Sequence, residues 1–96
     1  MAAYMIITRE GPIRDQTEMD IYSKKNRENP RDPNLTPLVI YGAITALEGL
    51  PPEGALVLQF PTVEAAKAWY NSPAYQAAIP HRQKAADYRI FIVEGL

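Results

Sequence analysis

The hydrophobic residues of this chain gather in four short runs, separated by stretches rich in polar residues, glycine and proline. The runs consist mainly of β-branched, aromatic and long aliphatic residues, as is typical of strands. The pattern therefore predicts four β-strands, at residues 4–8, 38–44, 55–60 and 88–93.

Between the first two runs, the apolar residues recur at the spacing of a helix. Met19 and Tyr22 stand one turn apart, and Asp15 precedes a glutamate by three residues, as in a capping box. Basic residues gather near the C-terminal end, where the helix dipole favours them. We therefore expect a helix over residues 16–26, followed by a proline-rich loop over residues 29–37.

A second helical interval follows the third run. Thr62 is suited to cap its first turn, and apolar residues follow at helical spacing. The Asn-Ser-Pro sequence at residues 71–73 predicts a break, after which a further helical piece starts near Ala74. We expect Pro80 to end or kink that piece, because proline lacks the backbone N–H that a helix interior uses.

The order of elements is β-α-β-β-α-β, the ferredoxin-like arrangement of an antiparallel sheet with two main helices on one face. Successive strand residues point to opposite faces, yet residues 5–7, 56–58 and 90–93 are apolar at every position. Both faces of the sheet then require burial, and two helices can cover only one. We therefore expect one α+β domain over residues 1–96, and a homodimer in which two sheets pack face to face.

Composition narrows the classes of function. The chain has 96 residues, a net charge of -1, one histidine and no cysteine. Disulfides and thiolate sites are thereby excluded, and the scattered carboxylates show no ligand spacing, so we expect no metal and no cofactor. The N-terminus lacks the basic region of a signal peptide, and no apolar run reaches membrane-spanning length. We expect a cytoplasmic protein without membrane contact.

Binding to nucleic acid is disfavoured, although the same topology occurs in RNA-recognition modules. Those modules stack bases on aromatic residues of the first and third strands. Here the two central stacking positions of the third strand are Ala55 and Val57, whose side chains cannot stack. The chain also lacks the basic excess that phosphate contacts require.

The residues best suited to chemistry lie in the stretch 68–82, which contains Trp69, Tyr75, the only histidine, His81, and Arg82. The predicted break lets both aromatic rings face a gap between helix and sheet. A histidine can move a proton near neutral pH, and an arginine can hold a carboxylate or enolate oxygen. The alternative is structural: both rings are packing residues, and the histidine lies on the surface.

Three further residues have two interpretations each. Tyr22 and Tyr41 are candidates to place hydroxyl groups in the same gap, and ordinary packing is their alternative. Glu48 stands where the second strand gives way to a turn. It is a candidate for ligand binding, for solvent exposure, or for an ion pair with Arg9 or Arg89 from neighbouring strands.

Several motifs carry a family resemblance: L-E-G at residues 47–49, Q-F-P-T at 59–62, A-W-Y-N-S-P-A-Y at 68–75, and a V-E-G-L ending. Together with Arg82 they resemble the domain-of-unknown-function 1330 family over nearly the whole chain. The resemblance implies a ferredoxin-like fold and a dimeric α/β barrel. The wider superfamily includes cofactor-free monooxygenases, lactone isomerases and dehydratases. Some of those monooxygenases carry a tryptophan and a tyrosine spaced like Trp69 and Tyr75.

Two functions remain open. In the first, a homodimer binds a small, partly apolar molecule (aromatic, carbonyl or lactone-like) between helices and sheet, with or without cofactor-independent proton transfer or oxygenation. In the second, the dimer is non-catalytic and serves as a structural or interaction module or as a small-molecule carrier. The catalytic candidates are His81, Arg82 and Tyr75, and the substrate-binding candidates are Trp69, Tyr22, Tyr41 and Glu48.

Overall fold

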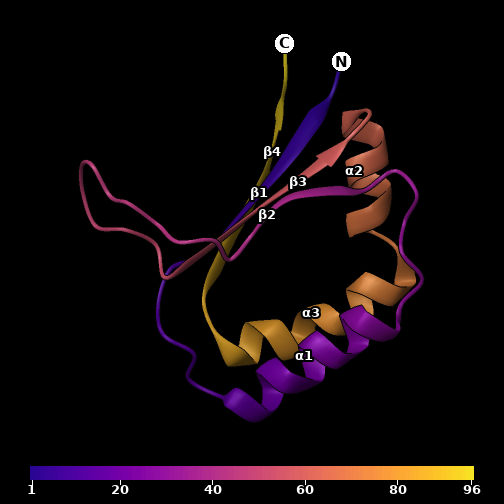
Figure 1. Ribbon diagram of the computed structural model, residues 1–96. Helices are drawn as coiled ribbons and strands as arrows, with labels where there is room; N and C mark the ends of the chain where they lie inside the picture. The colour runs from indigo at the N-terminus through magenta and orange to yellow at the C-terminus, as the bar shows by residue number, and fades with distance from the viewer.

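Four antiparallel strands form one sheet in the order β2-β3-β1-β4, and three helices accompany it (Figure 1). The computed structural model describes residues 1–96. The elements are β1 (Ala3–Arg9), α1 (Gln16–Glu28), β2 (Thr36–Ile40), β3 (Gly54–Phe60), α2 (Val63–Tyr70), α3 (Pro73–Ala85) and β4 (Tyr88–Glu94). The predicted α+β, ferredoxin-like order is confirmed, with the second helical interval divided into α2 and α3.

The first two helices begin where their capping residues predict. The Asp15 side chain accepts a hydrogen bond from the backbone N–H of Glu18, and the Thr62 hydroxyl accepts one from the N–H of Ala65. Each contact satisfies one of the free donors of a first helical turn. α1 runs on to Glu28, two residues past the predicted end.

The predicted break at residues 71–73 is confirmed, and of the two predicted effects of Pro80, an end of the helix is wrong. Ser72 caps α3 by accepting from the N–H of Tyr75, and the helix then continues through Pro80 to its end. A proline at this position leaves only the carbonyl of Gln76 without its helical partner. Both residues are exposed, so water can satisfy that carbonyl without distorting a packed surface.

The second strand lies earlier in the chain than its hydrophobic run predicts. β2 covers Thr36–Ile40 instead of residues 38–44, and its pairing with β3 contains an irregularity after Pro37. Proline is tolerated here because β2 is an edge strand. Tyr41 ends the strand because its φ of 51° lies in the left-handed region.

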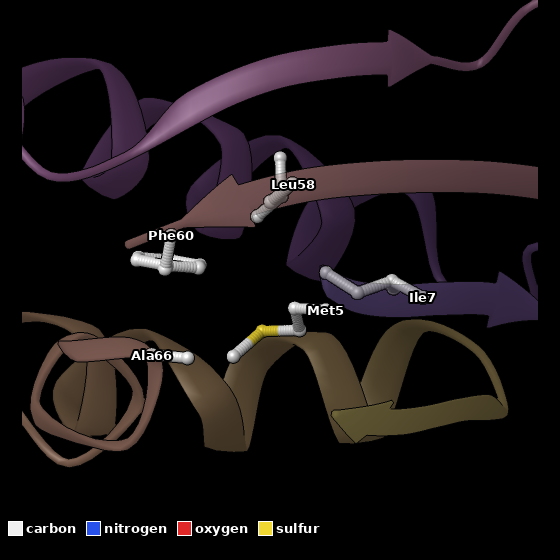
Figure 2. Close-up of a cluster of buried hydrophobic side chains, with 5 residues drawn as sticks. All are labelled: Met5, Ile7, Leu58, Phe60 and Ala66. Carbon is white, nitrogen blue, oxygen red and sulfur yellow. The ribbon is translucent and has the colours of Figure 1, made fainter. Parts of the chain in front are cut away.

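The main core lies on the helix-facing side of the sheet. Met5 and Ile7 of β1 and Leu58 and Phe60 of β3 are buried with Ala66 of α2 (Figure 2). They alternate along each strand with residues that point to the other face, as the period of a strand requires. α2 therefore covers one end of the sheet, and its small alanine allows close approach.

The opposite face of the sheet is apolar and carries no helix. Ile6 of β1 lies between Val57 of β3 and Phe91 of β4 in the register of the sheet. The side chain of Phe91 is 47 % exposed, and so is that of Val93. The prediction that both faces of the strands are apolar is thus confirmed, and one face remains open in the single chain.

α1 and α3 form a second layer in which they pack side by side (Figure 1). Met19 of α1 is buried against Ala85 and Ala86 at the end of α3. Larger side chains, mainly tyrosines, occupy the space between this helical pair and the strands. That space contains the site described below.

The connection between β2 and β3 projects away from the domain (Figure 1). Leu47 and Leu50 near its tip are 91 % and 97 % exposed. Neither residue therefore contributes to the core of the single chain. None of the three helices has the length and apolar character needed to cross a bilayer.

Candidate functional site

A pocket with a volume of about 560 Å³ lies between α1 and the sheet. Most of the residues around it are hydrophobic, and the polar ones lie on α1 and at the end of β1. The lining residues are Ile7, Arg9, Ile13, Met19, Tyr22, Ser23, Asn26, Arg27, Ile40, Tyr41, Leu56 and Tyr88. A volume of this size accommodates a small organic molecule.

Two tyrosines close the strand side of the pocket. The hydroxyl oxygens of Tyr41 and Tyr88 lie 3.0 Å apart and share a hydrogen bond. The ring of Tyr41 lies directly over Gly54, where an added Cβ would come within 2.8 Å of two ring carbons. Glycine at this position is therefore what allows the ring to reach Tyr88. Burial, together with the hydrogen bond shared with Tyr41, raises the pKa of Tyr88 above its ordinary value.

A second pair of tyrosines lies between α1 and α3. The hydroxyl oxygens of Tyr22 and Tyr75 are 2.8 Å apart, and Nη1 of Arg82 donates to the Tyr75 oxygen over 3.0 Å. Tyr22 lines the pocket, whereas Tyr75 is buried behind it. Burial raises the pKa of Tyr75 above its ordinary value, Tyr22 adds to the increase, and Arg82 opposes it. Tyr75 is therefore a neutral hydroxyl at pH 7.

Arg82 carries a buried positive charge with no acidic partner. Its side chain is 5 % exposed, it forms no ion pair, and its Nε has no hydrogen-bond partner. The guanidinium carbon lies 5.4 Å from the ring centre of Tyr88 and 6.0 Å from that of Tyr22. These cation–π contacts offset part of the cost of burying the charge. Both rings also line the pocket, so the guanidinium stands directly behind the pocket wall.

His81 does not line the pocket. Its Nδ1 lies 2.5 Å from a carboxylate oxygen of Glu18, and this pair joins α3 to α1. Both side chains are largely buried, but neither lines the pocket. The structure thus gives His81 a partner on the neighbouring helix and separates it from Tyr22 and Tyr41.

Trp69 and Tyr75 lie against each other, with ring centres 4.2 Å apart. Trp69 also contacts Phe60 of the main core, at 5.9 Å between ring centres. Neither Trp69 nor Tyr75 lines the pocket. The two rings instead fill the junction between α2, α3 and the sheet.

Glu48 lies on the projecting connection, exposed and remote from the other candidates. It pairs with neither of its predicted partners: Arg9 donates to the backbone carbonyls of Gly11 and Glu53, and Arg89 pairs with Glu10. Of its three interpretations, the one that the single chain displays is solvent exposure.

The structure brings Tyr22, Tyr75 and Arg82 together and sets Tyr41 across the same pocket. The site also contains three residues that were not predicted from the sequence: Arg9, Arg27 and Tyr88. A signal for Arg9 was present, because it follows Met5 and Ile7 at the two-residue period of the helix-facing side. No comparable signal marks Arg27, since only the placement of α1 over the sheet brings it to the rim.

A smaller pocket of about 300 Å³ lies between α2 and β4. It is lined by Lys67, Tyr70 and Asn71 among others, and by none of the predicted site residues. No group of three or more histidine and carboxylate side chains comes together in a way that could hold a metal ion.

The family model described as "Domain of unknown function (DUF1330)" matches residues 2–96. The chain belongs to the DUF1330 family. The predicted resemblance is thereby confirmed over residues 2–96. This DUF1330 chain matches no curated protein sequence.

Solved structures share the fold of this DUF1330 chain at low sequence identity. A protein of unknown function from Rhodopseudomonas palustris is 14 % identical with a TM-score of 0.65, covering 99 % of this chain and 82 % of the other. A dimeric, ferredoxin-like protein of unknown function from Bacteroides fragilis is 15 % identical with a TM-score of 0.61, covering 98 % and 96 %. A suggested antibiotic biosynthesis monooxygenase from Chloroflexus aurantiacus is 18 % identical with a TM-score of 0.50, covering 99 % and 95 %. At these sequence identities, the similarities show a shared fold alone.

Proposed function

We propose that this DUF1330 protein binds a small, partly apolar molecule in the pocket between α1 and the sheet. The observation that carries the proposal is the pocket of about 560 Å³ with its mainly hydrophobic lining. Polar groups are few: four polar residues and three tyrosines line the pocket, and two of the polar residues are arginines. Ligand sites of proteins combine an apolar cavity with a small number of such groups.

Binding of indole, a neutral aromatic probe, tests this proposal. Indole added to labelled protein should shift the backbone amide NMR signals of lining residues such as Met19 and Leu56. Ser23→Trp places a large ring in the pocket and should abolish those shifts. Ala77→Trp adds the same ring on the exposed side of α3 and is the matched control. If indole leaves the lining residues unaffected, or if both variants behave alike, the proposed pocket is wrong.

We also propose that two copies pack through the open face of the sheet. The face is apolar over three strands, and exposed apolar patches of this kind mark interaction surfaces. A symmetric pair would bury Phe91 and Val93 of both copies. The Bacteroides fragilis protein, which has a similar fold, is described as dimeric.

Light scattering with a charged substitution tests the dimer. Phe91→Glu places a carboxylate in the middle of the proposed interface and should convert the dimer to a monomer. Ala77→Glu places the same charge on the exposed side of α3 and should leave the mass unchanged. A monomeric mass for the natural protein at micromolar concentration would reject the proposal.

Enzymatic proton transfer next to a carbonyl group is a second candidate. The observation that favours it is the buried charge of Arg82 behind the wall of the pocket, because such a charge stabilises an oxyanion that forms during a reaction. His81 would act as acid or base, which requires that its pair with Glu18 open. Exchange of the methylene protons of benzyl methyl ketone in deuterium oxide measures the activity. His81→Ala should abolish the exchange, and full retention would reject this role.

A further inference from the structure

Hydrogen bonds link Arg82 to Tyr75 and Tyr75 to Tyr22 behind the pocket. Which group donates in each bond indicates what functional group the ligand carries. We infer that Tyr22 presents its O–H to the pocket, and that the ligand is an apolar molecule with an anionic acceptor group such as a carboxylate, phenolate or enolate. The inference rests on the proposed binding function and specifies the chemical class of the ligand.

The direction follows from counting donors and acceptors. The Tyr75 oxygen accepts from Arg82, which can only donate. Tyr75 is buried, and Tyr22 is the only other partner of its hydroxyl group. If Tyr22 donated to Tyr75, the hydrogen of Tyr75 would be buried without an acceptor, which is costly. Tyr75 therefore donates to Tyr22.

The same direction leaves the Tyr22 hydroxyl hydrogen without a partner inside the protein. Tyr22 is one of the pocket-lining residues and is only partly buried. Its O–H is thus available to an acceptor in the pocket. Each bond in a chain of hydrogen bonds polarises the next, and this chain begins at a cation, so Tyr22 is a strengthened donor.

The charges around the pocket favour an anion independently of this network. No acidic side chain lines the pocket, whereas Arg9 and Arg27 do. Arg82 adds a third positive charge, which is buried and has no counter-charge. A cation bound here would lie beside like charges. An anion would supply the opposite charge that the site lacks.

Three probes of nearly equal shape separate charge from size: benzoate is an anion at pH 7, benzamide is neutral, and benzamidinium is a cation. Dissociation constants are measured for each by NMR titration of the pocket-lining amide signals, at low and constant salt. We expect benzoate to bind about tenfold more tightly than benzamide, as for a hydrogen bond to a charged group. We expect benzamidinium to bind most weakly.

Tyr22→Phe tests the donor itself. It removes the O–H and keeps the ring, and it should reduce the preference for benzoate over benzamide to about twofold or less. Tyr70→Phe is the matched control, since Tyr70 also contacts the ring of Tyr75 but lies outside this pocket. An unchanged preference in Tyr22→Phe would overturn the assigned role of Tyr22.

The outcomes separate this inference from the proposed function. If indole or benzamide binds in the pocket and benzamidinium binds at least as tightly as benzoate, the inference fails and the binding pocket stands. If no probe shifts the pocket-lining signals, both fail. If benzoate is preferred and Tyr22→Phe removes the preference, both are supported.

Discussion

Arg82→Met should increase the stability of this protein, although it removes a buried side chain that makes a hydrogen bond. Methionine keeps an unbranched apolar stem of similar length and removes the guanidinium charge. The prediction follows from the uncompensated burial of that charge, because the side chain is 5 % exposed and forms no ion pair.

The magnitude depends on two opposed contributions. Substitution loses one charge-assisted hydrogen bond, about 1.5–3 kcal/mol, and two cation–π contacts of about 0.5–2 kcal/mol each, since the guanidinium is buried. It relieves an uncompensated buried charge, about 3–5 kcal/mol, and the unpartnered Nε, about 1–3 kcal/mol. The midpoints of these ranges leave a net gain of about 1 kcal/mol in the free energy of unfolding.

Urea denaturation at fixed protein concentration, followed by far-ultraviolet circular dichroism, measures this change. The expected gain moves the midpoint upward by about 0.5 M urea. Tyr75→Phe is the informative counterpart, because it keeps the buried charge and removes the only acceptor of Arg82. It should lower the free energy of unfolding by about 2–3 kcal/mol.

The two variants must therefore change stability in opposite directions. If Arg82→Met lowers the free energy of unfolding by more than about 1 kcal/mol, the guanidinium stabilises the native state on balance. The charge of Arg82 would then not be one that lacks compensation until an anionic ligand binds, even if the protein still bound small molecules.

Three other perturbations have defined outcomes. Trp69→Ala should lower the free energy of unfolding by about 3–5 kcal/mol, because the ring packs on Tyr75 and the core; a urea-measured loss below about 1 kcal/mol would contradict that packing. Gly54→Ala should displace the ring of Tyr41 and cost about 1 kcal/mol, whereas Gly42→Ala, whose new Cβ meets its nearest neighbour at 3.8 Å, should cost less than about 0.5 kcal/mol. The raised pKa of Tyr75 means that the folded protein holds this proton more tightly than the unfolded chain. The contribution of Tyr75 to stability is therefore complete below the ordinary value of 10.0 and falls above it by about 1.4 kcal/mol per pH unit, and the raised pKa of Tyr88 adds to the decline. Tyr75→Phe should make the decline less steep in denaturation measured from about pH 9 to 11, without abolishing it.

Residues 68–82 show which features of the site a local sequence pattern can predict and which it cannot. The break before Pro73 and the resulting pair of helices follow from capping chemistry, which acts within a few residues. The selection of Tyr75 and Arg82 as candidates rested on their residue types, and the structure places both behind the pocket. His81 and Glu48 were also selected by residue type. In the structure His81 pairs with Glu18, and Glu48 is exposed to solvent.

The sequence alone determined the order of strands and helices, the caps that begin α1 and α2, and the apolar character of both sheet faces. These properties depend on neighbours in the chain and on the fixed periods of strand and helix. Tertiary structure decided the site. α1 and α3 meet through contacts such as Tyr22 with Tyr75, which are 53 positions apart. The position of the pocket, the isolation of Arg82 from any carboxylate, and the direction of the tyrosine hydrogen bonds all arise from that long-range packing, which no local pattern specifies.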